Sequence, residues 1–439
     1  MTWRHFCDII KQTDTRFLFS ITNGSVQVME NITTKLWNKD FILLLAGMSF
    51  NLFANAILRF VLPLYILMES GDPSLMALVM TLSAIPLIIL SPIGGILADR
   101  INRKKILVIA DITNALAIIA FIISSDYFST GLGITVLLFI ILTFEGLLTP
   151  AQESSVPALV PEDKLLTANS MTFLIMTITS IISPILAGIF LARDNLLGIL
   201  LISIASYIIA TFFKSLINMP YVKQGRAKGI INQASSDLKS SIYFMRKENP
   251  VIGKITVILF FFCMFMTPIL LIGLPVLITG SLNMGEINVG ISTGIKTIGS
   301  VGGLALIGLL GDKVSIKNSR LLLMLESLMF VPVIISLLMV ENSTANFLIL
   351  TVAFFIMQIP ATMMVVIVYS HVQKETPDEL VGKVMALVAA AIVAGGAIGG
   401  QFYGELFAYF NHEPWVVLVI ALVLSLSVTF FASFDARKK

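Results

Sequence analysis

Charged residues are scarce in this sequence, which has 439 residues and only 13% Asp, Glu, Lys and Arg. Soluble domains carry about 25%, so the composition excludes an ordinary water-soluble fold. The hydrophobic share is 57% and the mean hydropathy is +0.94. Apolar runs of about 20 residues, the length that crosses a bilayer as a helix, recur along almost the whole chain. The sequence therefore predicts a helical membrane protein with many spans.

Cysteine and histidine are equally scarce, with two and three residues. Cys7 precedes the first apolar run and Cys263 lies inside another, which excludes a disulfide framework. The sequence also lacks the glycine-rich phosphate loop, the HExxH zinc motif and paired CxxC cysteines. We therefore expect no enzyme activity, no metal and no bound cofactor. The net charge of +3 gives no reason to expect nucleic acid as a partner.

The apolar runs predict twelve membrane helices. They span residues 41–68, 75–97, 106–124, 132–150, 166–192, 196–219, 252–279, 287–310, 320–340, 345–371, 381–409 and 415–434. With this division, 24 of the 29 Lys and Arg residues fall on one side of the membrane and one, Arg193, falls on the other. Because basic residues gather on the cytoplasmic side, we expect a multi-pass protein of the cell (plasma) membrane with both termini in the cytoplasm.

Polar stretches divide the chain into domains. Residues 1–40 contain no continuous apolar core and are predicted to be a cytoplasmic leader. Residues 221–250 form the only long polar stretch inside the chain and are predicted to be a cytoplasmic linker. They separate a six-helix bundle at 41–220 from a second at 251–439, which ends in a short basic tail.

The two bundles share an internal repeat at a distance of 212 to 213 residues. The segment GILADRINRKK, which begins at Gly95, aligns with GLLGDKVSIKN, which begins at Gly308. Asp99 matches Asp312, and Arg100 matches Lys313. Both segments follow the second helix of a bundle, so the sequence predicts two bundles built on one plan.

The first of these segments resembles the GxxxDRxGR[RK] signature of the major facilitator superfamily. The matching residues are Gly95, Asp99, Arg100, Arg103 and Lys104. Asn102 replaces the second glycine of the signature, a mild departure because Asn tolerates positive φ next best after Gly. The stretches Pro150–Ser170 and Pro377–Leu387 are similar to the drug-exporter branch of the family, which includes macrolide-efflux proteins.

This resemblance implies an all-α integral membrane fold of twelve transmembrane helices in two pseudo-symmetric six-helix bundles. It also implies a small-molecule substrate, a lipid bilayer as surroundings and no obligate protein partner. The signature residues, with Asp312 and Lys313 in the second half, are expected to form a conformational latch. In it, the Asp99 carboxylate would meet the free N–H groups at the start of the eleventh helix, near Pro377. The plain alternative is a charged turn that anchors topology.

Small residues recur in the fifth and eleventh helices, where they allow helices to approach closely. The antiporter signature of the fifth helix, roughly GxxxGPxxGG, is matched only in part. Its positions are occupied by Thr179, Ser183, Pro184, Ala187 and Gly188, with small residues in place of most glycines. We expect close helix packing at Pro184, Gly188, Gly395, Gly396, Gly399 and Gly400.

Polar residues inside the spans indicate a substrate cavity or an ion-coupling site. Gly47, Asn51, Asn55 and Arg59 share one face of the first helix, and we expect the asparagines to face a cavity rather than to join helices. Arg59 is expected to reach the outer headgroups, to face the cavity or to pair with Glu405.

Glu145 and Lys296 lie near the middle of their spans on opposite halves, and Gln358 holds in the tenth helix the place that Glu145 holds in the fourth. We predict that these three residues bind substrate or couple transport to protons. Asp111 and Glu326 are interpreted as structural partners of the adjacent basic loops.

Together these features predict a secondary active transporter that exports lipophilic or drug-like molecules by alternating access. The expected energy source is a proton gradient, with no cofactor. One alternative keeps the fold and makes the protein an importer or facilitator of a lipid or nutrient. Another is a transporter-like ligand receptor or scaffold.

Overall fold

The computed structural model describes residues 38–125, 127–161, 164–219, 238–310 and 314–431. Within this part, eleven helices are long and apolar enough to cross a membrane, and Pro414–Phe430 forms a shorter apolar helix. These helices coincide with the twelve predicted spans, so the predicted helical membrane fold is confirmed. Residues 1–37 of the predicted leader, most of the linker and the basic tail lie outside the described residues, and Lys39 and Asp40, which were assigned to the leader, belong to the first helix.

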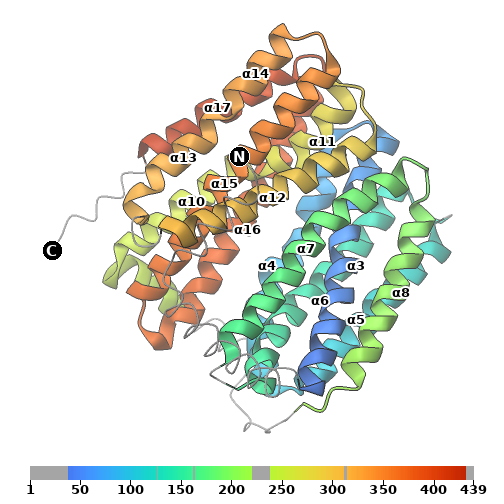
Figure 1. Ribbon diagram of the computed structural model, residues 1–439, viewed down its shortest axis with the longest axis vertical. Helices are drawn as coiled ribbons and strands as arrows, with labels where there is room; N and C mark the ends of the chain where they lie inside the picture. Colours follow the sequence, from blue (N-terminus) through green and yellow to red (C-terminus); the bar gives the residue numbers. More distant parts are fainter. Residues whose placement is uncertain (1–37, 126, 162–163, 220–237, 311–313, 432–439) are drawn as a thin grey trace, which may run out of the picture.

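The N-terminal half contains six long helices (Figure 1). They are α3 (Lys39–Ser70), α4 (Pro73–Arg100), α5 (Arg103–Ser124), α6 (Thr130–Leu159), α7 (Leu165–Leu191) and α8 (Leu196–Ser215). Local sequence sets where α3 starts and stops. The Asn38 side chain accepts a hydrogen bond from the backbone N–H of Phe41, and Gly71 ends the helix with a φ of 65°.

The C-terminal half begins with a continuous helical span, Pro250–Ser281. It comprises α10 (Pro250–Pro268), a π-helical turn (Ile269–Gly273), α11 (Leu274–Val276) and a second π-helical turn (Leu277–Ser281). Because proline has no backbone N–H, Pro275 cannot continue the α-helical hydrogen-bond pattern, and the wider turns lie on either side of it.

The remaining helices complete the second half. They are α12 (Glu286–Leu310), α13 (Ser319–Leu328), α14 (Phe330–Met339), α15 (Ser343–Glu375), α16 (Asp378–Tyr409) and α17 (Pro414–Phe431), with a short 3-10 turn at Ile316–Asn318. The predicted span 320–340 is therefore formed by two helices, α13 and α14, that join at Met329.

Figure 1 shows the two halves side by side, the first blue to green and the second yellow to red. They meet along two helix pairs, α7 with α12 and α4 with α16. One end of the molecule contains the start of α3, the end of α8 and the start of α10, and we call it the linker end. The opposite end is called the far end.

Close contacts join the halves toward the far end. A Cβ atom on Gly188 would lie 2.5 Å from the carbonyl oxygen of Glu286, and Gly290 is packed as tightly against the carbonyl of Pro184. On the other side of the molecule, the Thr81 hydroxyl donates a hydrogen bond of 2.8 Å to the Ala397 carbonyl. The small residues of α7 and α16 therefore lie where the two halves touch.

Other glycines of α16 pack inside the second half, against α10. Gly395 lies on the carbonyl of Phe260, and Gly399 lies on the carbonyl of Met264, with no room for a Cβ atom at either position. A Cβ atom on Gly396 would meet only the Thr267 side chain, at an ordinary 3.5 Å. The glycines of α16 thus include positions with no space for a Cβ atom and a position that has space for it.

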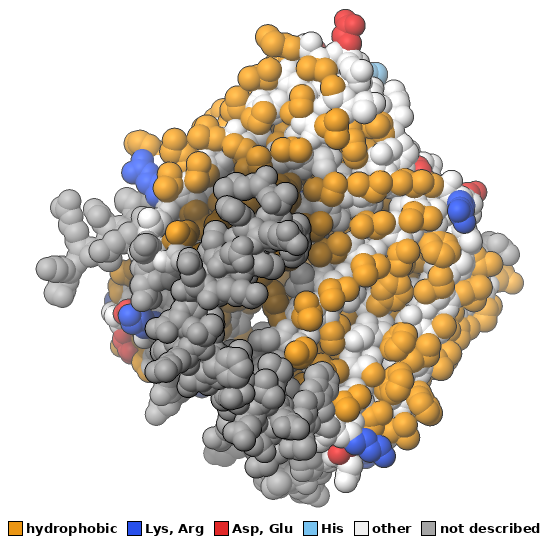
Figure 2. Space-filling model, in the orientation of Figure 1, with side chains coloured by type: hydrophobic (Ala, Val, Ile, Leu, Met, Phe, Trp, Pro, Cys, Tyr) orange, Lys and Arg blue, Asp and Glu red, His pale blue; other side chains and the backbone are white. Residues whose placement is uncertain are grey.

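The outer surface of the helices is apolar, as a bilayer requires. Large side chains such as Ile89, Phe212 and Val423 are more than half exposed. Figure 2 shows hydrophobic side chains spread over the visible face, with the basic and acidic side chains near its margins. This distribution agrees with a molecule whose sides face lipid.

The crowding at Gly399 gives a prediction about stability. Gly399→Ala is expected to cost about 1 to 3 kcal/mol because α16 must move away from Met264. Its melting temperature in detergent should fall by several degrees. Gly396→Ala, three residues away on the same helix, is the matched control and should melt near wild type. Equal melting temperatures for the two variants would contradict the packing described here.

Candidate functional site

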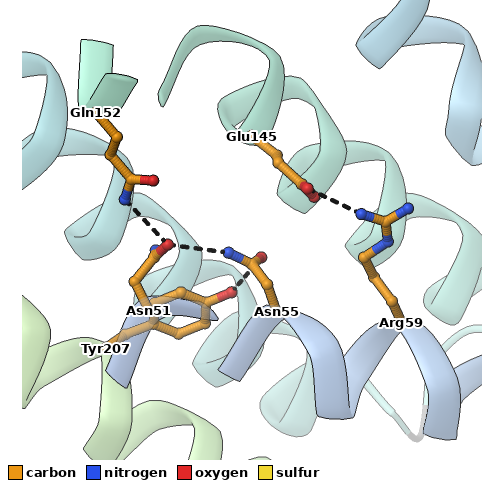
Figure 3. A network of polar contacts seen from close by, with 6 residues as sticks. All are labelled: Asn51, Asn55, Arg59, Glu145, Gln152 and Tyr207. Carbon is orange, nitrogen blue, oxygen red and sulfur yellow. Dashed lines mark hydrogen bonds and ion pairs between the residues drawn. The ribbon is translucent and has the colours of Figure 1, made fainter. Parts of the chain in front are cut away.

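The asparagines of α3 lie in a hydrogen-bonded network inside the N-terminal half (Figure 3). Asn51 donates to Asp111 of α5 at 2.7 Å and accepts from Gln152 of α6 at 3.3 Å. Tyr207 of α8 donates to the side-chain oxygen of Asn55 at 2.8 Å, and Asn55 in turn donates to Asn51 at 3.3 Å. All of these side chains are buried. The structure thus joins four helices through these residues, and the expectation that the asparagines face a cavity is wrong for this conformation.

A buried ion pair continues this network from Asp111. The Lys214 ammonium is 2.8 Å from the second carboxylate oxygen of Asp111, and both side chains have no exposed surface. Gly47 gives the Lys214 stem its room, because a Cβ atom there would lie 2.7 Å from Lys214 Cγ. The interpretation of Asp111 as a partner of an adjacent basic loop is therefore wrong: its partner is a lysine near the end of α8.

A second ion pair joins α3 to α6. Arg59 Nη1 lies 2.8 Å from Glu145 Oε1 (Figure 3), and the two side chains are 46% and 20% exposed. Glu405, which the sequence allowed either to pair with Arg59 or only to face water, is exposed and accepts a hydrogen bond from Gln401. The N-terminal half thus supplies a cationic partner to each of these two membrane-embedded carboxylates.

A cavity of about 430 Å³ lies between the halves. Its walls come from α7 of the first half and from α10, α12, α13, α15 and α16 of the second. Most of the lining is apolar, including Phe173, Met176, Phe262 and Met266. The volume is within the range of pockets that hold drug-sized ligands. The space-filling view is hollowed between the halves (Figure 2).

Ionisable and amide side chains reach the cavity from the second half. Lys296 and Gln358 line it, whereas Glu145, which was grouped with them from the sequence, does not. The Lys296 ammonium donates to the Leu270 carbonyl at 3.0 Å. Glu326 also lines it and is only 2% exposed, so its interpretation as a partner of a basic loop is wrong. Sequence reasoning missed Glu326 as a site residue. The signal was present, since Glu326 is an acidic residue inside an apolar run.

The residues of the predicted latch are described only in part. Arg103 Nη1 donates to the Ser154 carbonyl at 2.9 Å, which ties the start of α5 to the end of α6. Asn102 caps α5 by accepting from the Lys104 N–H, and its φ is −57°, so this position does not use the positive φ that Gly or Asn would allow. Gly95, Asp99 and Arg100 lie in the last turns of α4, with side chains outside the described residues, as are Asp312 and Lys313 entirely.

The buried pair of Asp111 and Lys214 gives a prediction. Asp111→Asn leaves the Lys214 ammonium buried without a counter-charge, which is expected to cost about 3 to 5 kcal/mol. The variant should melt well below wild type in detergent. Combining Asp111→Asn with Lys214→Met removes both charges and should recover most of the loss. A single variant as stable as wild type would show that the pair does not hold α5 to α8.

Comparison with known proteins gives the family. Residues 44–400 match the family described as Major Facilitator Superfamily. The chain is 27% identical over 185 residues to macrolide efflux protein A of Streptococcus pyogenes, an alignment that covers 42% of this chain and 46% of that protein. It is 30% identical over 119 residues to the enterobactin exporter EntS of Salmonella typhimurium, which covers 24% and 25%. The chain spans less than half the length of these curated relatives.

Solved structures with the same arrangement of helices are known. The nucleoside transporter NupG has a TM-score of 0.70 at 13% identity, covering 91% of this chain and 100% of that one. A POT family transporter in complex with a thioalcohol-conjugated peptide has a TM-score of 0.71 at 16% identity, covering 89% and 95%. At such identities the likeness shows the fold, while the family match covers most of the sequence. The chain therefore belongs to the Major Facilitator Superfamily and has the multi-pass helical membrane fold of that family.

Proposed function

We propose that this transporter is a secondary active exporter of lipophilic or drug-like small molecules, driven by proton antiport. The observation that carries the proposal is the cavity between the halves, which combines a mostly apolar lining with buried ionisable side chains. An apolar lining with Phe and Met side chains adapts to bulky lipophilic molecules. The two relatives described above are named as exporters, which supports the direction of transport.

Alternating access is the proposed mechanism, with the linker end in the cytoplasm and the far end outside. The contacts of α7 with α12 and of α4 with α16 toward the far end support a state that is closed to the outside. The cavity lies nearer the linker end of α7 and α12, where Phe173, Val301 and Leu304 line it. In the opposite state, the far-end contacts separate and the linker end closes through the latch at Asp99.

Proton coupling is assigned to Glu145, a membrane-embedded carboxylate of the N-terminal half. Its ion pair with Arg59 joins α3 to α6 and lies partly exposed on the N-terminal half. Protonation of Glu145 would release Arg59, and the two helices would then lose their charged contact. Such a change links one proton to one change of helix packing, which an antiporter requires.

Proteoliposomes with an internal pH dye test the proposal. A proton gradient is imposed, and macrolides, lipophilic cations and lysolipids are added in turn to wild type and to Glu145→Gln. We expect one class to collapse the gradient with wild type and to leave it intact with the variant, because the variant has no carboxylate to carry the proton. Glu405→Gln, an exposed position, is the control that should behave as wild type.

The same assay separates the rival functions. Collapse of the gradient by no compound, with folded protein, would contradict proton-coupled export. Net movement of substrate to the cytoplasmic side of the membrane would instead identify an importer or facilitator. Ligand binding without flux would identify a receptor or scaffold.

A further inference from the structure

The inference concerns Glu326, a carboxylate in the cavity that the proton-coupling account above does not use. Glu326 lies on α13 in the cavity wall and is only 2% exposed. Its Oε2 atom is buried and has no hydrogen-bond partner among the described residues. A carboxylate buried in this way is costly unless a proton or a cation neutralises it. The other two embedded carboxylates, Asp111 and Glu145, already have cationic partners.

Lys296 is the cation that lines the same cavity, but its ammonium donates a hydrogen bond to a backbone carbonyl. The Leu274 N–H bonds the Ile269 carbonyl across the π-helical turn. Pro275, which follows, has no N–H to offer. The Leu270 carbonyl is thus left to accept from the Lys296 ammonium, at 3.0 Å. This arrangement holds Lys296 at the π-helical turn Ile269–Gly273, where it forms no ion pair with Glu326.

The rest of the lining adds no charge. α7 contributes Phe173, Met176, Thr177 and Ser180 from the first half, all of them uncharged. The cavity of about 430 Å³ is therefore an apolar space with hydroxyl groups, the Gln358 amide, the Lys296 ammonium bound to the Leu270 carbonyl, and the Glu326 carboxylate, whose Oε2 atom has no hydrogen-bond partner among the described residues. At Glu326, this lining complements a lipophilic molecule whose positive charge lies beside the carboxylate, and it opposes an anionic group at the same place.

We propose that Glu326 receives the cationic group of the substrate and makes the cavity selective for lipophilic cations over neutral and anionic molecules of similar shape. The part of the proposal that concerns transport rests on the proposed function, whereas the binding itself does not. Glu326 is then a specificity-determining residue on α13, distinct from the Arg59–Glu145 pair of the other half.

Equilibrium binding to the purified full-length chain in detergent tests the proposal. The probe is radiolabelled tetraphenylphosphonium, and the competitors are neutral triphenylphosphine oxide and anionic triphenylacetate, which carry similar aryl groups. Wild type should bind the cation saturably, and the competitors should displace it poorly. Glu326→Gln should weaken binding by at least about tenfold, because the cation loses its buried counter-charge. Glu405→Gln, which changes an exposed carboxylate outside the cavity, should bind as wild type.

Two further measurements separate recognition from structure. Glu326→Asp keeps the charge and should keep most of the binding. Glu326→Gln should melt at or above the wild-type temperature, because it removes a buried charge without breaking an ion pair. Equal binding by wild type and Glu326→Gln, equal displacement by the neutral competitor, or no saturable binding by wild type would overturn the proposal. Binding of the cation without flux in proteoliposomes would count against export but would leave the cation site standing.

Discussion

A polar group inside a bilayer must find its partner within the protein, because lipid offers none. The rest of this structure follows from how each half meets that requirement. The N-terminal half pairs its charges internally, with Lys214 on Asp111 and Arg59 on Glu145, and it connects α3, α5, α6 and α8 through amide and phenol side chains. In the C-terminal half, the Lys296 ammonium donates a hydrogen bond to a backbone carbonyl, and Glu326 lines the cavity without an ion pair to any described residue. The first half thus joins these embedded charges in ion pairs, whereas the second, in its described part, leaves the Glu326 carboxylate without an ion pair in the cavity wall.

Glycine sets the second constraint, since it decides where the halves can touch. Gly188 and Gly290 bring the backbones of α7 and α12 together toward the far end, and no larger residue fits there. Nearer the linker end, the same two helices carry Phe173, Met176 and Leu304, which line the cavity. The size of the side chains along two helices therefore places the contact at one end and the cavity toward the other. A transporter of this fold needs such an arrangement, because the two ends must open in turn.

The sequence was sufficient to predict the helices, since each apolar run is long and polar residues mark its ends. Asn38, Gly71 and Asn102 lie where helices start or stop, as expected of these residue types. The partners of the buried charges were not predictable. Asp111 and Lys214 are about a hundred residues apart, and nothing in their own segments indicates that α5 and α8 lie side by side.

The same limit explains the other differences. A polar stripe on one helix face shows that the face avoids lipid, but it does not distinguish a cavity from a neighbouring helix, and for Asn51 and Asn55 the neighbours are helices. Glu326 is seven residues after the start of α13, which suggested the basic loop nearby as its partner, whereas the packing of α13 turns it to the cavity. Spacing along the chain thus identified the polar faces, and only the packing of the helices identified their partners.

The central claim, that two halves rock about the cavity so that the ends open in turn, can be tested by distances between spin labels. One pair, at Pro161 and Ser315, reports on the linker end, and the other, at Ala192 and Gly285, reports on the far end; all four positions are exposed. Labels are placed in a background with Cys7→Ser and Cys263→Ser, and distances are measured in nanodiscs with and without tetraphenylphosphonium, at acidic and neutral pH. The account predicts that one distance shortens when the other lengthens. Two distances that stay constant, or that change in the same direction, would contradict it.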